Sequence, residues 1–581
     1  MEQITTQEFS TRLHNAGDIE AFKDLSLTFD FSISQDNCKS KRLTFENCTF
    51  SKTFEICKID LNLGVAFKDC TFNEYLIIQG VTISEQFMDQ RIDHRNNSLL
   101  LENCKFDKVL SINSNQFLRD TKIDKSTIHE LLISNLTSTE GGFILRKCTI
   151  EYYVTMEQCR FMDSIRFHEV ICQDSLRFTN NTASSYSFND NTFNSDSWIW
   201  YGKLKEGINI QDGTYQKAFI VESVDAKGYL TISGAKFKSS VSIAYECKNG
   251  GKLYRYGCPK IYLRDSEFDY GLFINGKRFS EDNYPIEIID IHLSQLMKGE
   301  INIDGCNIAD LTIKGANYNC TLVLNNNQFT NITFNRLTNL SNIHLLNSRA
   351  NLDGDKSNAF KSINSYMGRT HFTNFSFEGF KNIELDDSNY SEIMTVNVRW
   401  FDPKRILQKS KNCKDYEKNR DLFRQLKYAM FKQGDRVQAL FFKRYEMQAL
   451  RKQLSMKNGH LGERAMLWMN GSNDHGQNWI KPMILGLLFT CLFYIVFIIS
   501  TAPELSNHFS FSTDNLVATL NVIPKYTFIA LKFLNPTHTY SSLGTDIRDN
   551  FLGNLFDIIQ RIVISYFIFQ TISAFRKYIK E

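Results

Sequence analysis

The sequence predicts a mainly β protein, with a long cytoplasmic β-solenoid (β-helix) followed by an α-helical neck and a two-transmembrane-helix pore module. Three observations predict this fold class. A strand-like pattern recurs about every 21–22 residues through residues 26–395. Between Phe401 and Lys481, 18 Lys and Arg residues face only 8 Asp and Glu residues. Two apolar segments of the length of membrane helices follow, within residues 481–581.

Each copy of the repeat follows one order of residue types: apolar, any, apolar, polar, polar, small, any, apolar. Leu43–Phe50 and Val65–Phe72 are two copies, and three late copies begin 21 residues apart from Ile301 onward. Such alternation is typical of strands, and a fixed short period is typical of a stacked solenoid. We therefore expect a β-helix over residues 26–395, with residues 1–25 forming a helical cap.

Six of the 14 cysteines take the small position of this repeat. We expect that position to point inward, where a small and weakly polar side chain fits, and we interpret the cysteines as packed interior residues. Metal binding or redox sensing is the alternative. Asparagines beside this position suit a turn, because Asn tolerates a left-handed backbone. The cysteines are Cys48, Cys70, Cys104, Cys148, Cys159 and Cys306, and the asparagines are Asn47, Asn103, Asn180, Asn326 and Asn347.

Two stretches of the solenoid region, residues 194–225 and 270–300, break the period and are interpreted as insertions. No P-loop, His-Glu-x-x-His or Gly-x-Ser-x-Gly motif occurs anywhere in the sequence. We therefore expect a protein that is not an enzyme and that needs no cofactor or metal. The long lateral surface of a solenoid typically binds a partner or assembles with further copies.

The N-terminal residues lack the basic and apolar segments of a signal peptide, so we expect the solenoid and both termini in the cytoplasm. The basic surplus between Phe401 and Lys481 agrees with that side, although the net charge of the whole chain is only +3. Basic residues beside a membrane helix face the cytoplasmic leaflet and contact its anionic lipids. Membrane lipid is therefore an expected partner.

The neck, residues 396–480, is expected to contain an antiparallel helical hairpin with its turn at Gly434. Its basic residues alternate with the aromatic residues Phe423, Tyr428, Phe431, Phe442 and Tyr445, which could stack on the bases of a nucleic acid. The simpler explanation is that the aromatic residues form the core of the hairpin. The apolar stripes are Leu422, Phe423, Leu426 and Met430 on the first helix, and Val437, Leu440, Phe441 and Tyr445 on the second.

Residues 481–581 are predicted to form a two-span transmembrane domain with a re-entrant loop. Pro482–Pro503 carries no charged residue and is long enough to cross a bilayer. The second span has to begin near Asn554, because the uncharged part after Arg561 is too short by itself. Between the spans, residues 515–523 and 526–534 are apolar enough to dip into the membrane.

Ionisable residues within a span are costly and usually functional. Asp557, Arg561 and Ser565 follow one another at intervals of four residues, and Thr571 lies close to the same stripe. We predict that these four residues line a polar pore in an oligomer. The alternative is an ion pair between Asp557 and Arg561 within one subunit. Residues 537–544 stand where a potassium channel has Thr-Val-Gly-Tyr-Gly, so potassium selectivity is not expected.

The segment Phe423–Met447 resembles the neck of bacterial pentapeptide-repeat or β-helix proteins that carry a C-terminal two-span ion-channel-like module. Ser472–Pro482 and Ala574–Tyr578 extend the resemblance. Proteins of this kind include membrane effectors of anti-phage defence. In the Hailong system, a β-helical channel subunit is held shut by single-stranded DNA that a partner nucleotidyltransferase makes, and loss of the DNA lets the channel depolarise the infected cell.

The resemblance implies a ligand-gated ion channel of the bacterial inner membrane that works as a homo-oligomer, with a tetramer expected. It also implies a single-stranded DNA oligomer as ligand, made by a partner nucleotidyltransferase. The competing interpretation is a non-conducting, membrane-anchored scaffold that docks a partner protein. The residues expected to contact phosphates are Arg420, Arg424, Lys427, Arg436, Lys443 and Arg444.

Overall fold

The computed structural model describes residues 1–61, 63–84, 97–244, 246–249, 252–255, 258–276, 286–351, 358–456, 460–501, 526–543 and 551–575. The chain divides into two compact units, Met1–Phe401 and Asp402–Glu581. The first unit is built of strands and the second of helices.

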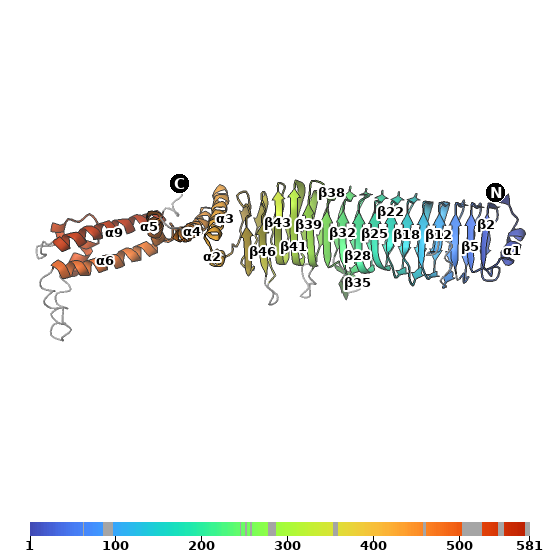
Figure 1. Ribbon diagram of the computed structural model, residues 1–581, viewed down its shortest axis with the longest axis horizontal. Coiled ribbons are helices and arrows are strands. Elements are labelled where there is room, and N and C mark those ends of the chain that lie inside the picture. Colours follow the sequence, from blue (N-terminus) through green and yellow to red (C-terminus); the bar gives the residue numbers. More distant parts are fainter. Residues whose placement is uncertain are drawn as a thin grey trace, which may run out of the picture. The chain divides into compact units, whose positions relative to one another are not determined.

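Met1–Phe401 is a β-solenoid of about 16 turns, so the predicted fold class is confirmed. Its parallel strands form two long sheets, and Figure 1 shows them stacked in rows from β2 (Ile19–Lys23) to β46 (Ala359–Ile363). Each turn contributes strands to both sheets, and apolar side chains of both sheets point into a shared interior. One representative turn consists of β18 (Phe143–Arg146), β19 (Thr149–Ile150), β20 (Val154–Glu157) and β21 (Arg160–Phe161).

The pairing register gives the length of a turn directly. Phe143 pairs with Ile165, which lies 22 residues later. Further along, Ile301 pairs with Leu322, and Leu322 pairs with Ile343, which gives 21 residues for each turn. The period read from the sequence is therefore the length of one coil. The strands concerned are β22 (Ile165–His168), β40 (Lys298–Asp304), β42 (Asn319–Asn325) and β44 (Ile343–Leu346).

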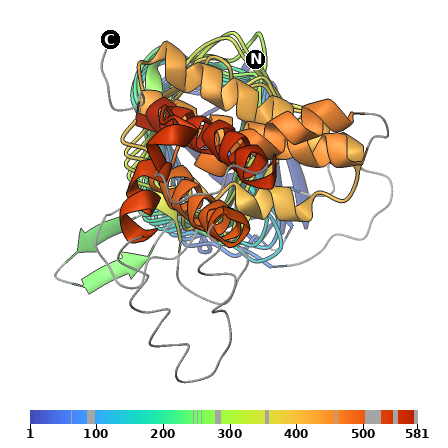
Figure 2. The ribbon, with the colours of Figure 1, turned by 90° about the vertical axis from the view of Figure 1, so that its left-hand side faces the viewer.

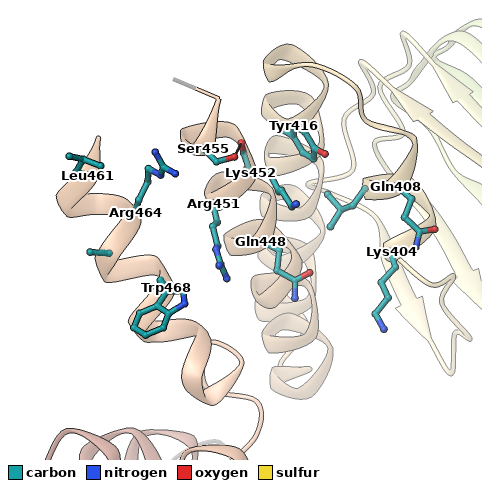
Figure 3. Close-up of a pocket in the computed structure, with 12 residues that line it drawn as sticks. Lys404, Gln408, Tyr416, Gln448, Arg451, Lys452, Ser455, Leu461, Arg464 and Trp468 are labelled. Atoms are coloured by element: carbon teal, nitrogen blue, oxygen red, sulfur yellow. Dashed lines mark hydrogen bonds between the residues drawn. The ribbon is translucent and has the colours of Figure 1, made fainter. Parts of the chain in front are cut away.

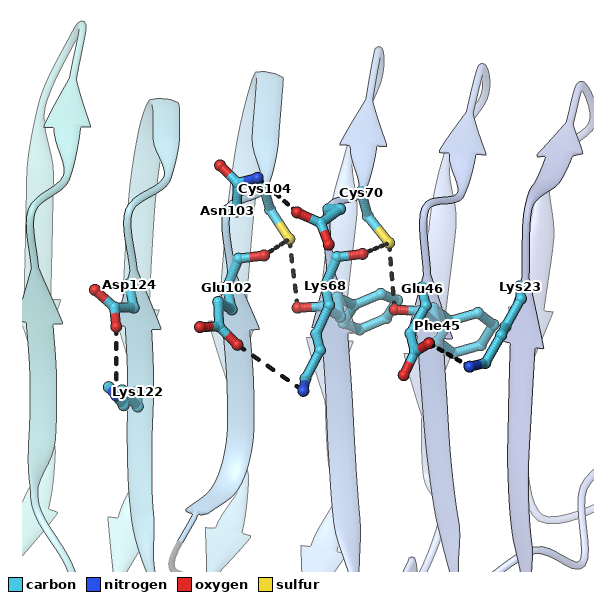
Figure 4. A network of polar contacts seen from close by, with 12 residues as sticks. Lys23, Phe45, Glu46, Lys68, Cys70, Glu102, Asn103, Cys104, Lys122 and Asp124 are labelled. Atoms are coloured by element: carbon cyan, nitrogen blue, oxygen red, sulfur yellow. Dashed lines mark hydrogen bonds and ion pairs between the residues drawn. The ribbon is translucent and has the colours of Figure 1, made fainter. Parts of the chain in front are cut away.

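The six cysteines of the repeat are buried inside the solenoid, as the sequence predicted. The thiol of Cys70 donates to the carbonyl oxygens of Lys68 at 3.2 Å and of Phe45, on the previous coil, at 3.5 Å (Figure 4). Cys104 repeats this arrangement one coil later. Each thiol thus satisfies carbonyl groups at the corner of a coil, which explains why a small and weakly polar residue occupies the position.

The corner itself is a left-handed backbone residue directly before the inward position. Asn47 and Asn103 have φ angles of 51° and 52°, as expected for Asn at such a turn. The same conformation also occurs at Lys147 and Gln158, which lack this preference. The corner geometry is therefore imposed by the coil, and Asn is only its preferred occupant.

Residues 194–225 are not an insertion, contrary to the interpretation from sequence. β27 (Ser197–Trp200) pairs in register with β30 (Phe219–Glu222), again at an interval of 22 residues. The pattern was hidden because Ser197 takes an inward position while Trp198 and Trp200 lie on the outer side.

An insertion does occur nearby, where Leu230 pairs with Ile261 after 31 residues. The additional residues include the antiparallel hairpin of β35 (Glu246–Asn249) and β36 (Lys252–Arg255), which projects from the side of the coils in Figure 2. The second expected insertion, residues 270–300, is partly formed by strands, β38 (Glu267–Asn275) and β39 (Ile286–Leu293). Residues 277–285 lie outside the described ranges.

The N-terminal helix α1 covers the first coil. It spans Thr6–His14 and begins with a capping box between Thr5 and Glu8. Phe9 is buried against the rings of Phe22 and Phe31, at centroid distances of 5.2 and 4.8 Å. The helix is shorter than the predicted cap of residues 1–25, because β1 (Glu2–Gln3) and β2 already pair with later strands.

The buried thiols should be chemically inert. Burial raises the pKa of Cys148, Cys159 and Cys306 to about 12. Because the thiolate is the reactive form, we expect a water-soluble maleimide at pH 7 to modify them on the order of a thousandfold more slowly than partly exposed Cys57 and Cys413. Pulsed labelling followed by peptide mass spectrometry measures this, and equal rates in buffer and in denaturant would contradict an inward ladder.

The helical unit begins with a short helix and an antiparallel hairpin. Lys427 of α3 faces Glu446 of α4, and Arg420 faces Gln453, so the two helices run in opposite directions. Gly434 forms the turn with a φ of +78°, as predicted. The helices are α2 (Lys404–Lys409), α3 (Cys413–Lys432), α4 (Arg436–Ser455), α5 (Leu461–Asn470), α6 (Ile480–Thr501) and α9 (Phe551–Phe575), with short 3-10 turns η1 (Gly471–Asn473) and η2 (Tyr540–Leu543).

The stripe predicted on α3 is buried, but the stripe predicted on α4 is partly wrong. Leu422, Phe423, Leu426 and Met430 all lie in the hairpin core. On α4, Val437 is exposed, and the helix instead buries a face rotated from the predicted one. The buried core residues of α4 are Ala439, Phe442, Tyr445 and Ala449.

Among the described residues, two helices are long and apolar enough to cross a membrane, α6 over Ile480–Ile498 and α9 over Phe551–Phe575. They pack side by side in opposite directions. Trp479 stacks on Phe575 at 4.8 Å, and further along the pair Phe489 stacks on Phe567 at 5.6 Å. The predicted apolar segment 515–523 lies outside the described residues, whereas residues 526–533 form a helical stretch.

Candidate functional site

Most of the basic residues predicted to hold phosphates are engaged inside the helical unit. Lys427 forms an ion pair of 2.7 Å with buried Glu446. Arg420 donates to Gln453 at 3.0 Å, and Arg424 pairs with Asp421 at 3.0 Å. These contacts tie α3 to α4 or lie along α3, so the side chains support the hairpin.

Two further residues of the predicted phosphate-binding set, Arg436 and Lys443, line one cleft of about 680 Å³. His475, from the segment before α6, lies on the same cleft. The opposite wall comes from α9, through Phe569 and Gln570. None of the described residues that line the cleft is acidic, so it offers positive charge to an anion between the neck hairpin and the end of α9.

The imidazole of His475 reports the electrostatics of this cleft. Burial is the main reason why the pKa of His475 is lowered to about 4; Asp474 opposes this shift, and the positive charges of Lys443, Arg444 and Arg451 each add a smaller lowering effect. His475 is therefore neutral at neutral pH. A phosphate in the cleft would stabilise its protonated form and would gain affinity as the pH falls.

Arg444, the sixth predicted residue, belongs to the junction between neck and α6. It pairs with Asp474 at 3.4 Å, and Asp474 also pairs with Lys481 of α6 at 3.2 Å. The neighbouring Asn473 donates to the carbonyl oxygen of Gln570 in α9 at 3.2 Å. The junction thus connects α4 with both candidate spans, which explains the polar residues of the Ser472–Pro482 segment.

The aromatic residues of the hairpin also divide into buried residues and residues at the surface. Phe423, Phe442 and Tyr445 are buried in its core, as the simpler explanation had it, and are not available to stack on bases. Tyr428 and Phe431 remain exposed, and Phe431 lies at the edge of the cleft that holds Arg436.

A second cationic groove, of about 870 Å³, was not predicted. Lys404 of α2, Arg451 and Lys452 of α4, and Arg464 of α5 line it, together with Trp468 (Figure 3). The part of this lining that the structure describes also contains no acidic residue. The sequence signal that could have found it is the spacing of Leu461, Arg464 and Trp468, which places them along one face of α5.

Within the membrane-type helices, Asp557 is the centre of a buried polar cluster. Its carboxylate contacts Nε2 of His538 at 2.7 Å and the guanidinium of Arg561, and only 1% of Asp557 is exposed. His538 Nδ1 lies 2.5 Å from the carbonyl oxygen of Asn535, so a doubly protonated ring would donate to both acceptors. The ion pair considered as the alternative to pore lining is therefore present within the subunit, with His538 as an additional partner.

The same region holds the segment between the two candidate spans in place. Gln560 of α9 donates to the carbonyl oxygen of Phe533 at 2.7 Å, and Tyr494 of α6 donates to the carbonyl oxygen of Tyr526. Phe533 is buried against Phe497 at a ring distance of 5.0 Å. Residues 526–543 are thus packed against the last turns of α6 and the first turns of α9.

The four residues predicted to line a pore lie in different environments. Asp557 is buried, Arg561 is partly exposed, Ser565 is exposed, and Thr571 is partly buried and donates to the carbonyl oxygen of Phe567. The stripe drifts around α9 because four residues advance the helix by slightly more than one turn. Within the residues that the structure describes, Arg561 Nε and Gln560 Oε1 are buried without a hydrogen-bond partner.

No protein-family model, curated protein or solved structure matches this chain. Across the described ranges, no group of three His, Cys, Asp or Glu side chains is placed as metal ligands would be.

His475 should make the stability of the helical unit depend on pH. An unfolded His titrates near pH 6.5, whereas the folded pKa is about 4, so the unfolded state binds more protons between these values. Folding stability is then lost as the pH falls through this window, by on the order of 2 kcal/mol after allowance for solvent screening. His475→Asn tolerates the left-handed φ of +57° and should flatten this part of the profile in detergent-solubilised unfolding curves. An unchanged difference between pH 7 and pH 4.5 would contradict the assignment.

Proposed function

We propose that this chain is a subunit of a ligand-gated ion channel in the bacterial inner membrane, with the solenoid and both termini in the cytoplasm. The observation that carries the proposal is the packing of residues 526–543 between α6 and α9. A helix, a re-entrant segment and a second helix form a pore only when several copies surround an axis, so the active form is a homo-oligomer, with a tetramer expected. Membrane lipid surrounds α6 and α9.

The ligand of this channel is an anionic oligomer, and the proposed one is single-stranded DNA made by a partner nucleotidyltransferase. The cleft of Arg436, Lys443 and His475 supports this, because it combines cations with the exposed ring of Phe431. Bound DNA would hold the channel closed. Removal of the DNA during phage infection would open it and depolarise the cell, as the resemblance to anti-phage effectors implies.

The cleft also suggests how binding reaches the pore. Its walls come from α4, from the segment before α6 and from α9, so an occupant touches the neck and the second candidate span together. Beside the cleft, Asp474 joins α4 to α6 through Arg444 and Lys481, and Asn473 joins the same segment to α9 through Gln570. A ligand that binds in the cleft can therefore bias the position of α4 relative to α9, which is the requirement for a ligand to control a pore.

Conductance of the purified full-length protein in planar bilayers tests the proposal. We expect unitary currents that a single-stranded oligonucleotide suppresses and that a nuclease restores. Absence of current from a correctly inserted oligomer, with and without oligonucleotide, would remove the channel function.

One observation favours a second candidate function, that of a membrane-anchored scaffold that docks a partner protein on its solenoid. Asp557 is fully satisfied inside the subunit by His538 and Arg561, so its charge alone does not require a pore. Ser565→Leu separates the two functions, because Ser565 is exposed on α9. A pore should change its conductance or its toxicity on overexpression, whereas an anchor should tolerate the change.

A further inference from the structure

Helix α5 is an apolar helix whose side chains its described neighbours leave uncovered, although its Met469 carbonyl oxygen accepts a hydrogen bond from Tyr566 of α9. None of its ten residues is buried. Leu461, Met466 and Trp468 expose 76%, 66% and 64% of their surfaces. Leu461 and Trp468 lie on one face of the helix and Met466 on another, and such a concentration of exposed large apolar residues on one short helix marks a contact with an apolar partner.

The groove beside α5 gathers cations that the fold itself does not use. Elsewhere in the neck, Lys427, Arg424 and Arg444 have carboxylate partners. By contrast, Lys404, Arg451, Lys452 and Arg464 line one groove with no acidic residue, and within the described ranges no ion pair involves them. Figure 3 shows Arg464 and Trp468 on α5 facing the side chain of Arg451 on α4. The groove therefore combines cations from α2, α4 and α5 with the apolar and aromatic side chains of α5, Leu461 and Trp468.

The position of α5 in the chain limits what can occupy this groove. Asn470 ends α5, and Ile480 begins the first described helix that is both long and apolar enough to cross a membrane. The short connection is pinned to α9, where Ser472 lies 3.0 Å from the hydroxyl of Tyr566. An apolar helix with basic neighbours, held beside the end of a span, matches the interfacial helices of membrane proteins.

We propose that α5 lies in the membrane interface and that the groove between α5 and α4 binds the phosphate headgroup of an anionic phospholipid. Leu461, Met466 and Trp468 would enter the acyl-chain boundary, while Arg451, Lys452 and Arg464 hold the phosphate. The inference rests on the membrane insertion contained in the proposed function but does not depend on conductance. It makes the neck a second membrane contact, so that the anionic lipid content of the membrane regulates the position of the hairpin next to α6.

The lipid contact is tested on the full-length protein in nanodiscs that contain phosphatidylcholine with brominated phosphatidylglycerol. Fluorescence quenching of the wild type is compared with that of Trp468→Phe, so that the difference isolates Trp468 from the other four tryptophans. We expect the Trp468 contribution to be quenched by at least half. The proposal is overturned if removal of Trp468 leaves the quenched fraction unchanged, since Trp468 then does not reach the acyl chains.

The headgroup site is tested by the lipids that co-purify with the protein. Arg451→Glu with Arg464→Glu should lower the ratio of bound phosphatidylglycerol to phosphatidylcholine by at least about fivefold. The matched control is Lys414→Glu with Lys432→Glu, which reverses two exposed charges on α3 away from the groove and should leave the ratio within twofold of the wild type.

Three results would overturn the headgroup site. An equal loss of lipid in both double variants would mean a diffuse charge effect. Loss of oligonucleotide binding with unchanged lipid in the groove variant would assign the groove to nucleic acid. A change of oligomer size with unchanged lipid would assign α5 to a second copy of the chain. A protein that retains lipid selectivity but passes no current would refute the channel function alone.

Discussion

Asp557→Ala is expected to destabilise the membrane-type helices by about 3–5 kcal/mol and to abolish any conductance. The carboxylate lies between His538 and Arg561, and its removal leaves the buried imidazole without its hydrogen-bond partner and the partly exposed guanidinium without its counter-charge. In a bilayer, water is not available to replace the lost partner, so the cost falls on packing of residues 526–543 against α9. Thermal unfolding of the protein in detergent, together with bilayer recording, provides the measurement.

Two further variants separate a structural role of Asp557 from direct lining of a pore. Asp557→Ala combined with Arg561→Met removes both members of the ion pair and should recover part of the lost stability. Ser565→Ala changes an exposed position of α9 and should not affect stability. If Asp557→Ala were as stable as the wild type while its conductance changed, the buried cluster would be the wrong description and direct pore lining the right one.

The solenoid could be predicted from the sequence because its physics is local and repetitive. Every coil has to match the one before it, so the interval from Phe143 to Ile165 appears both as a sequence period and as a strand register. Most inward positions carry apolar side chains, and the buried Asn residues there, such as Asn181 and Asn191, donate to backbone carbonyl oxygens of the preceding coil, so the alternation is preserved. The same reasoning failed at Ser197, because a serine fits inside the coil as well as a larger apolar residue does, and hydrophobicity alone does not reveal it.

The candidate sites were less predictable, because their partners are distant in the sequence. Arg420, Arg424 and Lys427 look identical to Arg436 and Lys443 as a list of basic residues. Only the folded hairpin shows that Glu446, which lies 19 residues away in the sequence, neutralises Lys427 and leaves Arg436 and Lys443 in the cleft. His538 was likewise not expected beside Asp557, since nothing in an isolated helix pattern selects a partner from the segment between the two spans.

Neutralising Arg436 and Lys443 together, as Arg436→Gln with Lys443→Gln, is expected to weaken binding of a single-stranded oligonucleotide by about 100- to 1000-fold. Both residues line the cleft beside α9, and within the described residues no ion pair involves either of them. Each phosphate contact that is lost should also reduce the dependence of binding on salt. For two contacts, the slope of log K against log salt should become shallower by about 1.4. Fluorescence anisotropy over a salt series measures both quantities.

The control for this experiment removes the same charge from the same hairpin. The control variant is Arg424→Gln with Lys414→Gln. Arg424 belongs to the predicted set but is already paired with Asp421, and Lys414 is an exposed residue of α3. If the cleft is the binding site, this pair should change the affinity by less than about threefold, because exposed or already neutralised charges contribute little. If the neck instead binds nucleic acid as a diffuse basic surface, both pairs should lose affinity and salt dependence equally. The comparison therefore decides whether the ligand is held at the place that touches α9, which is what control of a pore requires.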